Sequence, residues 1–116
     1  MIGAVGVALG AFGAHGLRDR IPQDLLEVYR TAVLYHLLHA VTLLAVVLGG
    51  ARVRYAGVVR WLLVIGIVIF SGTLYTLALT GQRWLGAVTP LGGLAFIGAW
   101  ATLFVGGAVS HESTTR

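Results

Sequence analysis

The sequence predicts an all-α integral membrane protein, a four-helix transmembrane bundle formed by one domain, 1–116. Four stretches of the chain carry no charged residue: Met1–Leu17, Thr31–Ala51, Trp61–Gln82 and Trp84–Ser110. Three of them exceed the roughly 18 apolar residues that mark a membrane-spanning helix. Apolar residues make up 58% of the chain and charged residues 10%, with a mean hydropathy of +0.91. Because so little polar sequence remains, we expect the lipid bilayer to surround most of this protein.

The expected helices cover residues 2–17, 22–49, 57–80 and 87–109. The first lacks the basic segment that opens a signal peptide, so it is expected to be a retained helix. Its glycines fall on one stripe of a helix: Gly3, Gly6, Gly10 and Gly13. Such a stripe lets another backbone approach closely, which favours helix packing inside a membrane.

The second helix is expected to begin near Pro22, a residue favoured in the first helical turn. Asp24 and Glu27 follow it, and carboxylates stabilise a helix N-terminus. Gly49 and Gly50 are expected to end this helix. The third helix should end near Gly81, and a tight turn then leads into the fourth.

Thr89 and Pro90 are typical of a helix N-cap followed by the first turn, although a start near Trp84 with a proline kink is an alternative. The fourth helix also carries small residues on one face: Gly92, Ala95, Ala99, Thr102 and Gly106. This pattern indicates a tight bundle or a tight interface with a second copy. The tail after residue 109 is polar, and we expect it to be mobile.

The charge balance is positive, with a formal net charge of +4 and a sequence pI near 10.4. All eight basic residues are arginines at the boundaries of apolar stretches, which argues against nucleic-acid binding and favours lipid head-group anchoring. The cluster of Arg52, Arg54 and Arg60 favours a cytoplasmic second loop. We therefore expect a multi-pass protein of the inner (plasma) membrane with both termini in the cytoplasm.

The absence of cysteine excludes disulfides, thiolate iron–sulfur ligation, covalently attached c-type haem and cysteine nucleophiles.

Four motifs occur in order along the chain: Ala11-Phe12-Gly13-Ala14-His15-Gly16-Leu17, Tyr35-His36-Leu37-Leu38-His39-Ala40, Phe70-Ser71-Gly72-Thr73-Leu74-Tyr75 and Thr89-Pro90-Leu91-Gly92-Gly93. This set resembles the DUF423 family of small bacterial inner-membrane proteins, which has relatives among small animal transmembrane proteins. The resemblance spans the whole chain. It implies a four-helix membrane protein and no particular activity.

Successive helices cross the membrane in opposite directions, so the polar residues of these motifs are expected to lie within roughly 15 Å of one membrane face. They are His15, Tyr35, His36, His39, Ser71, Tyr75 and Thr89. Polar groups in hydrocarbon normally face the bundle interior, so we expect one polar cluster on the side of the first and third loops.

Two interpretations of this cluster compete. In the favoured one, hydrogen bonds between the polar side chains hold the helices together. In the other, His15, His36 and His39 bind a metal or haem, or the cluster forms a proton relay or a pocket for a quinone or lipid head group. Ser71 has no neighbouring acid–base pair that would make it a nucleophile.

The sequence therefore favours a non-enzymatic structural or accessory membrane protein with no catalytic residue and no cofactor. Its partners would be the lipid bilayer and either further copies or a larger membrane complex, with packing through the Gly/Ala faces. The alternatives are a binding protein that uses the histidines, and a small oligomeric transporter or channel.

Overall fold

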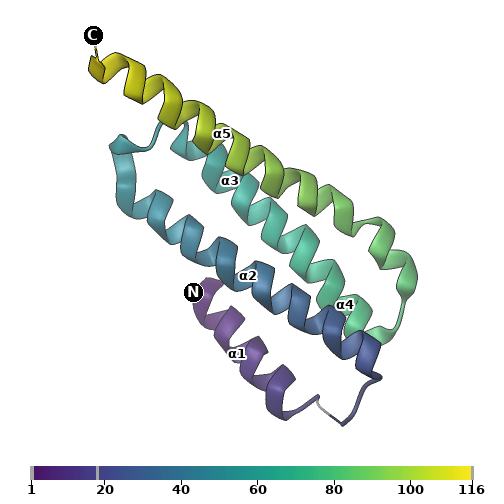
Figure 1. Ribbon diagram of the computed structural model, residues 1–116. Coiled ribbons are helices and arrows are strands. Elements are labelled where there is room, and N and C mark those ends of the chain that lie inside the picture. Colours follow the sequence, from purple (N-terminus) through teal and green to yellow (C-terminus); the bar gives the residue numbers. More distant parts are fainter. Residues whose placement is uncertain (1, 18, 116) are drawn as a thin grey trace.

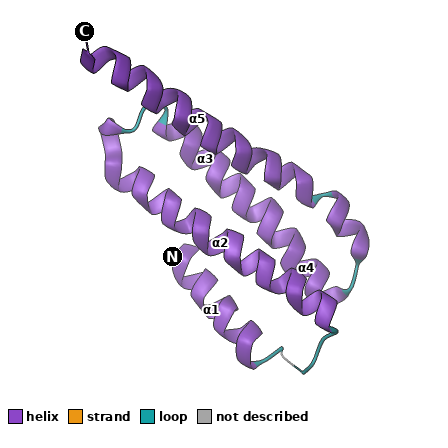
Figure 2. Cartoon of the chain, viewed as in Figure 1, coloured by secondary structure: helices purple, strands orange, loops and turns teal. Residues whose placement is uncertain are grey.

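The computed structural model describes residues 2–17 and 19–115, with side chains as far as Gly107. Helices make up nearly all of the described chain, and no strand occurs in it (Figure 2). The α-helices are α1 (Ile2–His15), α2 (Gln23–Gly49), α3 (Ala56–Gly66), α4 (Gly72–Thr80) and α5 (Thr89–Thr115). A π-helical turn, η2 (Ile67–Ser71), joins α3 to α4, so these three elements form one continuous rod.

Three described segments are long and apolar enough to cross a membrane: Gln23–Arg52, Ala56–Thr80 and Arg83–Gly107. The remaining helix, α1 at the start of the chain, is also apolar but has only 14 residues. At 1.5 Å per residue it is about 21 Å long, which is shorter than the roughly 30 Å of a bilayer's hydrocarbon core. The described chain therefore begins beside the middle of α2 (Figure 1).

The helices lie side by side in the order α1, α2, α3–α4 and α5 (Figure 1). α2 packs against α1 on one side and against α3, η2 and α4 on the other, while α5 packs along α3 and η2. One buried cluster joins α2, α3 and α5 through Val46, Val59, Leu63 and Ala99. A second, near the first loop, contains Leu26, Tyr29 and Ala78.

The small-residue stripes pack inside the chain. A Cβ atom added to Gly92 of α5 would lie 2.8 Å from Cα of Phe70 and closer still to its backbone nitrogen. Ala99 is fully buried, and Gly106 packs against Arg54 of the loop before α3. On α1, Gly6 and Gly13 pack against side chains of α2, whereas a Cβ added at Gly3 would meet no atom within 4 Å. The stripes thus contribute to a tight bundle within the chain, and an interface with a second copy stays a prediction.

Several local expectations need correction. The fourth helix does not end near residue 109 but continues to Thr115, because no glycine or proline follows Gly107 to stop it. Before it lies a 3-10 turn, η3 (Arg83–Ala87), and α5 proper begins at Thr89 with Pro90 in its first turn. The π-helical turn η2 between α3 and α4 was not expected from the sequence.

The third expected helix corresponds to the rod of α3, η2 and α4, and its expected end near Gly81 is confirmed. Gly81 has φ 73°, and its N–H donates to the carbonyl of Leu77 at 2.7 Å. Glycine adopts this left-handed conformation without steric cost, which closes the helix C-terminus.

Candidate functional site: a polar network between the helices

His36 lies at the centre of the polar network and is buried, with 5% of its surface exposed. Its Nε2 is 2.9 Å from the carbonyl oxygen of Ile2, and its Nδ1 is 3.0 Å from the hydroxyl of Tyr75. A carbonyl can only accept a hydrogen bond, so Nε2 carries the proton of the neutral ring. Nδ1 is then an acceptor, and the Tyr75 hydroxyl donates to it. Both ring nitrogens of His36 are thereby satisfied.

His39, one turn further along α2, is the opposite tautomer. Its Nδ1 is 2.8 Å from the carbonyl oxygen of Tyr35, so this nitrogen carries the proton. The indole N–H of Trp100 donates to Nε2 at 3.2 Å. The imidazole also stacks on the ring of Phe96, with centroids 3.6 Å apart. His39 thus connects α2 to α5, and no lone pair of its ring is left unused.

Tyr29 repeats the contact that His36 makes with α1. Its hydroxyl donates to the carbonyl of Leu9 at 2.5 Å. Tyr29 and His36 are seven residues apart on α2, and their acceptors Leu9 and Ile2 are seven apart on α1. We call Tyr29 and His36 the anchor pair.

Glycine sits opposite each member of the anchor pair. A Cβ at Gly13 would lie 2.7 Å from Cδ1 of the Tyr29 ring. A Cβ at Gly6 would lie 3.3 Å from Cδ2 of His36 and 2.6 Å from Cδ2 of Leu37. Gly6 and Gly13 each follow an acceptor carbonyl by four residues. The same turn of α1 therefore offers both an acceptor and the space for the donor to reach it.

Two further polar contacts cross between helices. Ser71, at the end of the π-turn, donates to the carbonyl of Ala32 on α2 at 2.9 Å and is 1% exposed. Thr73 of α4 and Thr89 of α5 share a hydrogen bond of 2.8 Å between their hydroxyls. Thr89 also bonds back to the carbonyl of Leu85 at 3.2 Å, so its side chain connects the helices and does not cap α5.

The expected cluster is only partly assembled. His36 and Tyr75 meet directly, and the ring of Tyr35 stacks near His39 with centroids 5.9 Å apart. His15 is exposed at the far end of α1. Since Ile2 lies opposite His36, His15 is about 20 Å from that level along the helix axis. Among the described residues no three His, Cys, Asp or Glu side chains gather as a group that could hold a metal, so His15 does not join His36 and His39 as the alternative interpretation required.

Sequence reasoning missed three members of the network: Tyr29, Thr73 and Trp100. Tyr29 could have been found, because two helical turns place it on the same face of α2 as His36. Trp100 could not, since its contact depends on the register between α2 and α5, which single-helix periodicity does not contain.

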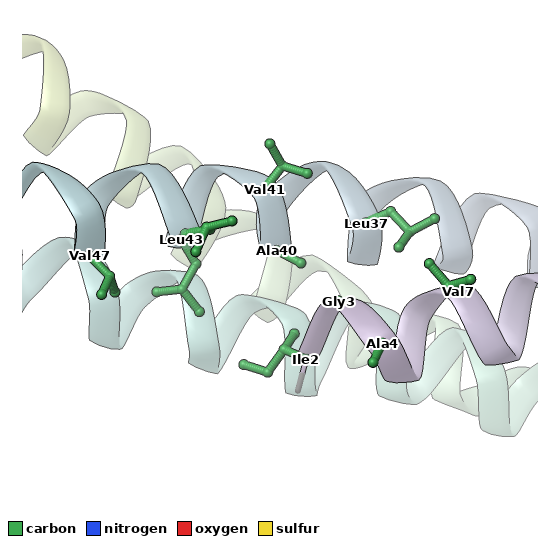
Figure 3. A pocket seen from close by; sticks show the side chains of 10 residues that line it. Ile2, Gly3, Ala4, Val7, Leu37, Ala40, Val41, Leu43 and Val47 are labelled. Atoms are coloured by element: carbon green, nitrogen blue, oxygen red, sulfur yellow. The ribbon is translucent and has the colours of Figure 1, made fainter.

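A groove of 560 Å³ lies beside the network, between the first turns of α1 and the second half of α2 (Figure 3). Every residue lining it is apolar, including Ile2, Gly3 and Val7 of α1 and Ala40, Leu43 and Val47 of α2. Because no side chain that lines it is polar, this groove suits hydrocarbon.

The apolar helices and the hydrogen bonds between them define a small α-helical integral membrane protein. A family model described as protein of unknown function (DUF423) matches residues 9–93. The chain belongs to this family.

Its relatives include several proteins named only as UPF0382 membrane proteins. The chain is 48% identical over 102 residues to YwdK of Bacillus subtilis, covering 85% of this chain and 83% of that protein. It is 46% identical over 101 residues to SSP2132 of Staphylococcus saprophyticus, covering 86% and 84%. It is 39% identical over 114 residues to C1782.12c of Schizosaccharomyces pombe, covering 90% and 93%. No solved structure matches the chain.

Proposed function

We propose that this protein is a structural or accessory component of the inner (plasma) membrane, without catalysis or a cofactor of its own. One observation carries the proposal: its interhelical polar side chains hydrogen-bond to one another or to the backbone. His36 bonds to α1 and α4, His39 to α5, and Ser71 to α2. In the described part of the chain, no buried side-chain nitrogen or oxygen lacks a hydrogen-bond partner.

Both ring nitrogens of His36 and of His39 already have hydrogen-bond partners, which argues against the alternative in which these histidines bind a metal or haem. A metal would need the lone pair of Nδ1 on His36 or of Nε2 on His39. Those lone pairs accept hydrogen bonds from Tyr75 and Trp100. Ligation would therefore break a bond between helices, and the donor left behind would remain unsatisfied in hydrocarbon.

The outer faces of α2 and α5 are where such a component would meet a second copy or another subunit. Both carry large apolar side chains: Leu38, Val41, Leu44 and Leu48 on α2, and Leu94, Ile97 and Phe104 on α5. Most residues of the Gly/Ala stripes, such as Gly6, Gly13 and Gly92, pack inside the bundle, so we expect association to use these bulkier surfaces.

Purification of the protein in native lipid nanodiscs, followed by metal analysis, a visible spectrum and quinone extraction, tests the absence of a cofactor. We expect no stoichiometric metal, haem or quinone. A bound group that disappears in both His36→Gln and His39→Gln would contradict the proposal. His15→Gln is the matched control, because His15 lies outside the network and should change nothing.

Photo-crosslinking in the membrane tests the association. A crosslinker replacing Leu48 or Phe104, each 77% exposed, should give a discrete adduct of one additional chain. The same group at Leu63, which is fully buried, should react only within the chain. Adducts with lipid alone at every outward position would contradict the accessory role.

A further inference from the structure

A second hollow lies at the end of the bundle where α2 connects to α3. It has a volume of 220 Å³ and is lined by residues 52–54 of the connection and by Leu103, Gly106 and Gly107 of α5. Its lining includes Arg52 and Arg54, whereas the groove beside α1 has no charged residue, and it also includes the apolar side chains of Val53 and Leu103. This combination matches the boundary between a lipid head group and its acyl chains.

Within the described part of the chain, no carboxylate pairs with the arginines at this hollow. Arg52 and Arg54 are exposed, as is Arg60 in the first turns of α3. Among the described residues the ion pair present is Arg83 with Asp24, at the opposite end of the bundle. The guanidinium of Arg54 lies 5.2 Å from the centre of the Tyr55 ring, which holds its charge near the connection.

The neighbouring aromatic residues mark the depth of the hollow. Trp61 is 70% exposed and Tyr55 is 47% exposed. Tryptophan and tyrosine are enriched where a membrane meets water, at the level of the phospholipid head groups. From these aromatic residues we infer that Arg52 and Arg54 lie at the depth of the lipid phosphates.

Two glycines shape the wall formed by α5. A Cβ at Gly106 would lie 3.2 Å from both Cβ and the carbonyl oxygen of Arg54, so α5 approaches the connection closely there. A Cβ at Gly107 would have no atom within 4 Å. The wall is thus bare backbone at Gly107, and a bound group can approach it.

We propose that this hollow binds the head group of an anionic phospholipid, with Arg52 and Arg54 contacting its phosphate. Guanidinium groups pair with phosphate through two parallel hydrogen bonds, and uncompensated arginines at a membrane surface attract anionic lipids. Leu103 contacts the beginning of an acyl chain. This lipid site is independent of the proposed accessory role.

Native mass spectrometry of the detergent-solubilised protein, titrated with phosphatidylglycerol, tests the site. We expect one tightly bound phosphatidylglycerol and weaker binding of phosphatidylcholine, whose net charge is zero. The double variant Arg52→Gln/Arg54→Gln should weaken phosphatidylglycerol binding by about tenfold or more, since each arginine near a membrane surface contributes on the order of 1 kcal/mol. Arg20→Gln, at the opposite end, should leave binding unchanged.

Gly107→Leu tests the shape of the hollow without removing charge. It should fold, because its side chain enters open space, and it should weaken binding of phosphatidylglycerol. Gly57→Leu is the control, since Gly57 also has open space and does not line the hollow. Equal loss in Arg20→Gln, equal binding of phosphatidylcholine, or displacement of the lipid by millimolar inorganic phosphate would overturn the proposal.

Discussion

At the residue scale, the two histidines of α2 use both ring nitrogens in opposite tautomers. His36 donates from Nε2 to a carbonyl of α1, whereas His39 donates from Nδ1 to a carbonyl of its own helix. The free lone pair of each ring then accepts from an aromatic side chain of a neighbouring helix. In hydrocarbon no water can replace these partners, so each ring fixes the rotation of α2 against its neighbours.

Tyr75→Phe tests this account at His36. The substitution removes the donor to Nδ1 and leaves the buried lone pair unsatisfied, so we expect a loss of about 0.5–1.5 kcal/mol of stability. His36→Leu should cost a similar amount by stranding the Tyr75 hydroxyl, whereas His36→Gln should retain most of the stability. Thermal unfolding in detergent measures each change.

Thr76→Val is the matched control for Tyr75→Phe, because the Thr76 hydroxyl is exposed and bonds within its own helix to Gly72 at 2.9 Å. Its unfolding temperature should stay close to that of the native chain. The double variant His36→Leu/Tyr75→Phe should lose less than the sum of the two single changes. Additive losses would show that the two side chains do not interact.

At the element scale, the π-turn brings the third rod and α5 into backbone contact. Phe70 lies within the turn, and its main chain touches the position where a Gly92 side chain would begin. The following residue, Ser71, bonds to Ala32 on α2. A π-turn inserts one extra residue and redirects the side chains around it, so this segment can contact α2 and α5 at the same level.

Gly92→Ala and Gly93→Ala form a matched pair at this crossing. The Cβ at position 92 would collide with the backbone of Phe70, which cannot rotate away, so we expect a loss of about 1–3 kcal/mol. The Cβ at position 93 would lie 3.9 Å from the Phe70 ring, an ordinary contact. Unfolding temperatures in detergent compare the two. Equal stability of the variants would contradict the close approach of α5 to the π-turn.

The sequence predicts the helices well and their mutual register poorly, for a physical reason. Hydropathy and glycine stop signals such as Gly81 are properties of one segment, so they identify the helices. The position of His15 relative to His36 depends on how α1 is aligned along α2. Counting residues from the membrane face contains no information on this alignment, and it placed both histidines in one cluster. The π-turn likewise depends on partners in other helices, and no local pattern around Phe70 specifies it.

At the scale of the whole molecule, the arginines and the polar network lie toward opposite ends of α2. The hydrogen-bonded network extends from Tyr29, near the first loop, to His36, beside the middle of α2. Arg52 and Arg54 lie at the other end, around the hollow beside Gly107. The orientation of the chain therefore decides which leaflet contains the Tyr29 end of the network and which contains the proposed lipid site.

A reporter fused after Arg116 should be active on the cytoplasmic side of the membrane. Short loops rich in arginine are retained in the cytoplasm, and Arg52, Arg54 and Arg60 form the densest such cluster in the chain. Replacing all three with glutamine should reduce the cytoplasmic fraction of the reporter, whereas the same change at Arg20 alone should not. A reporter active only outside would reverse the assignment. The Tyr29 end of the hydrogen-bonded network would then lie in the cytoplasmic half of the bilayer, and the hollow at Arg52 and Arg54 would face the outer leaflet.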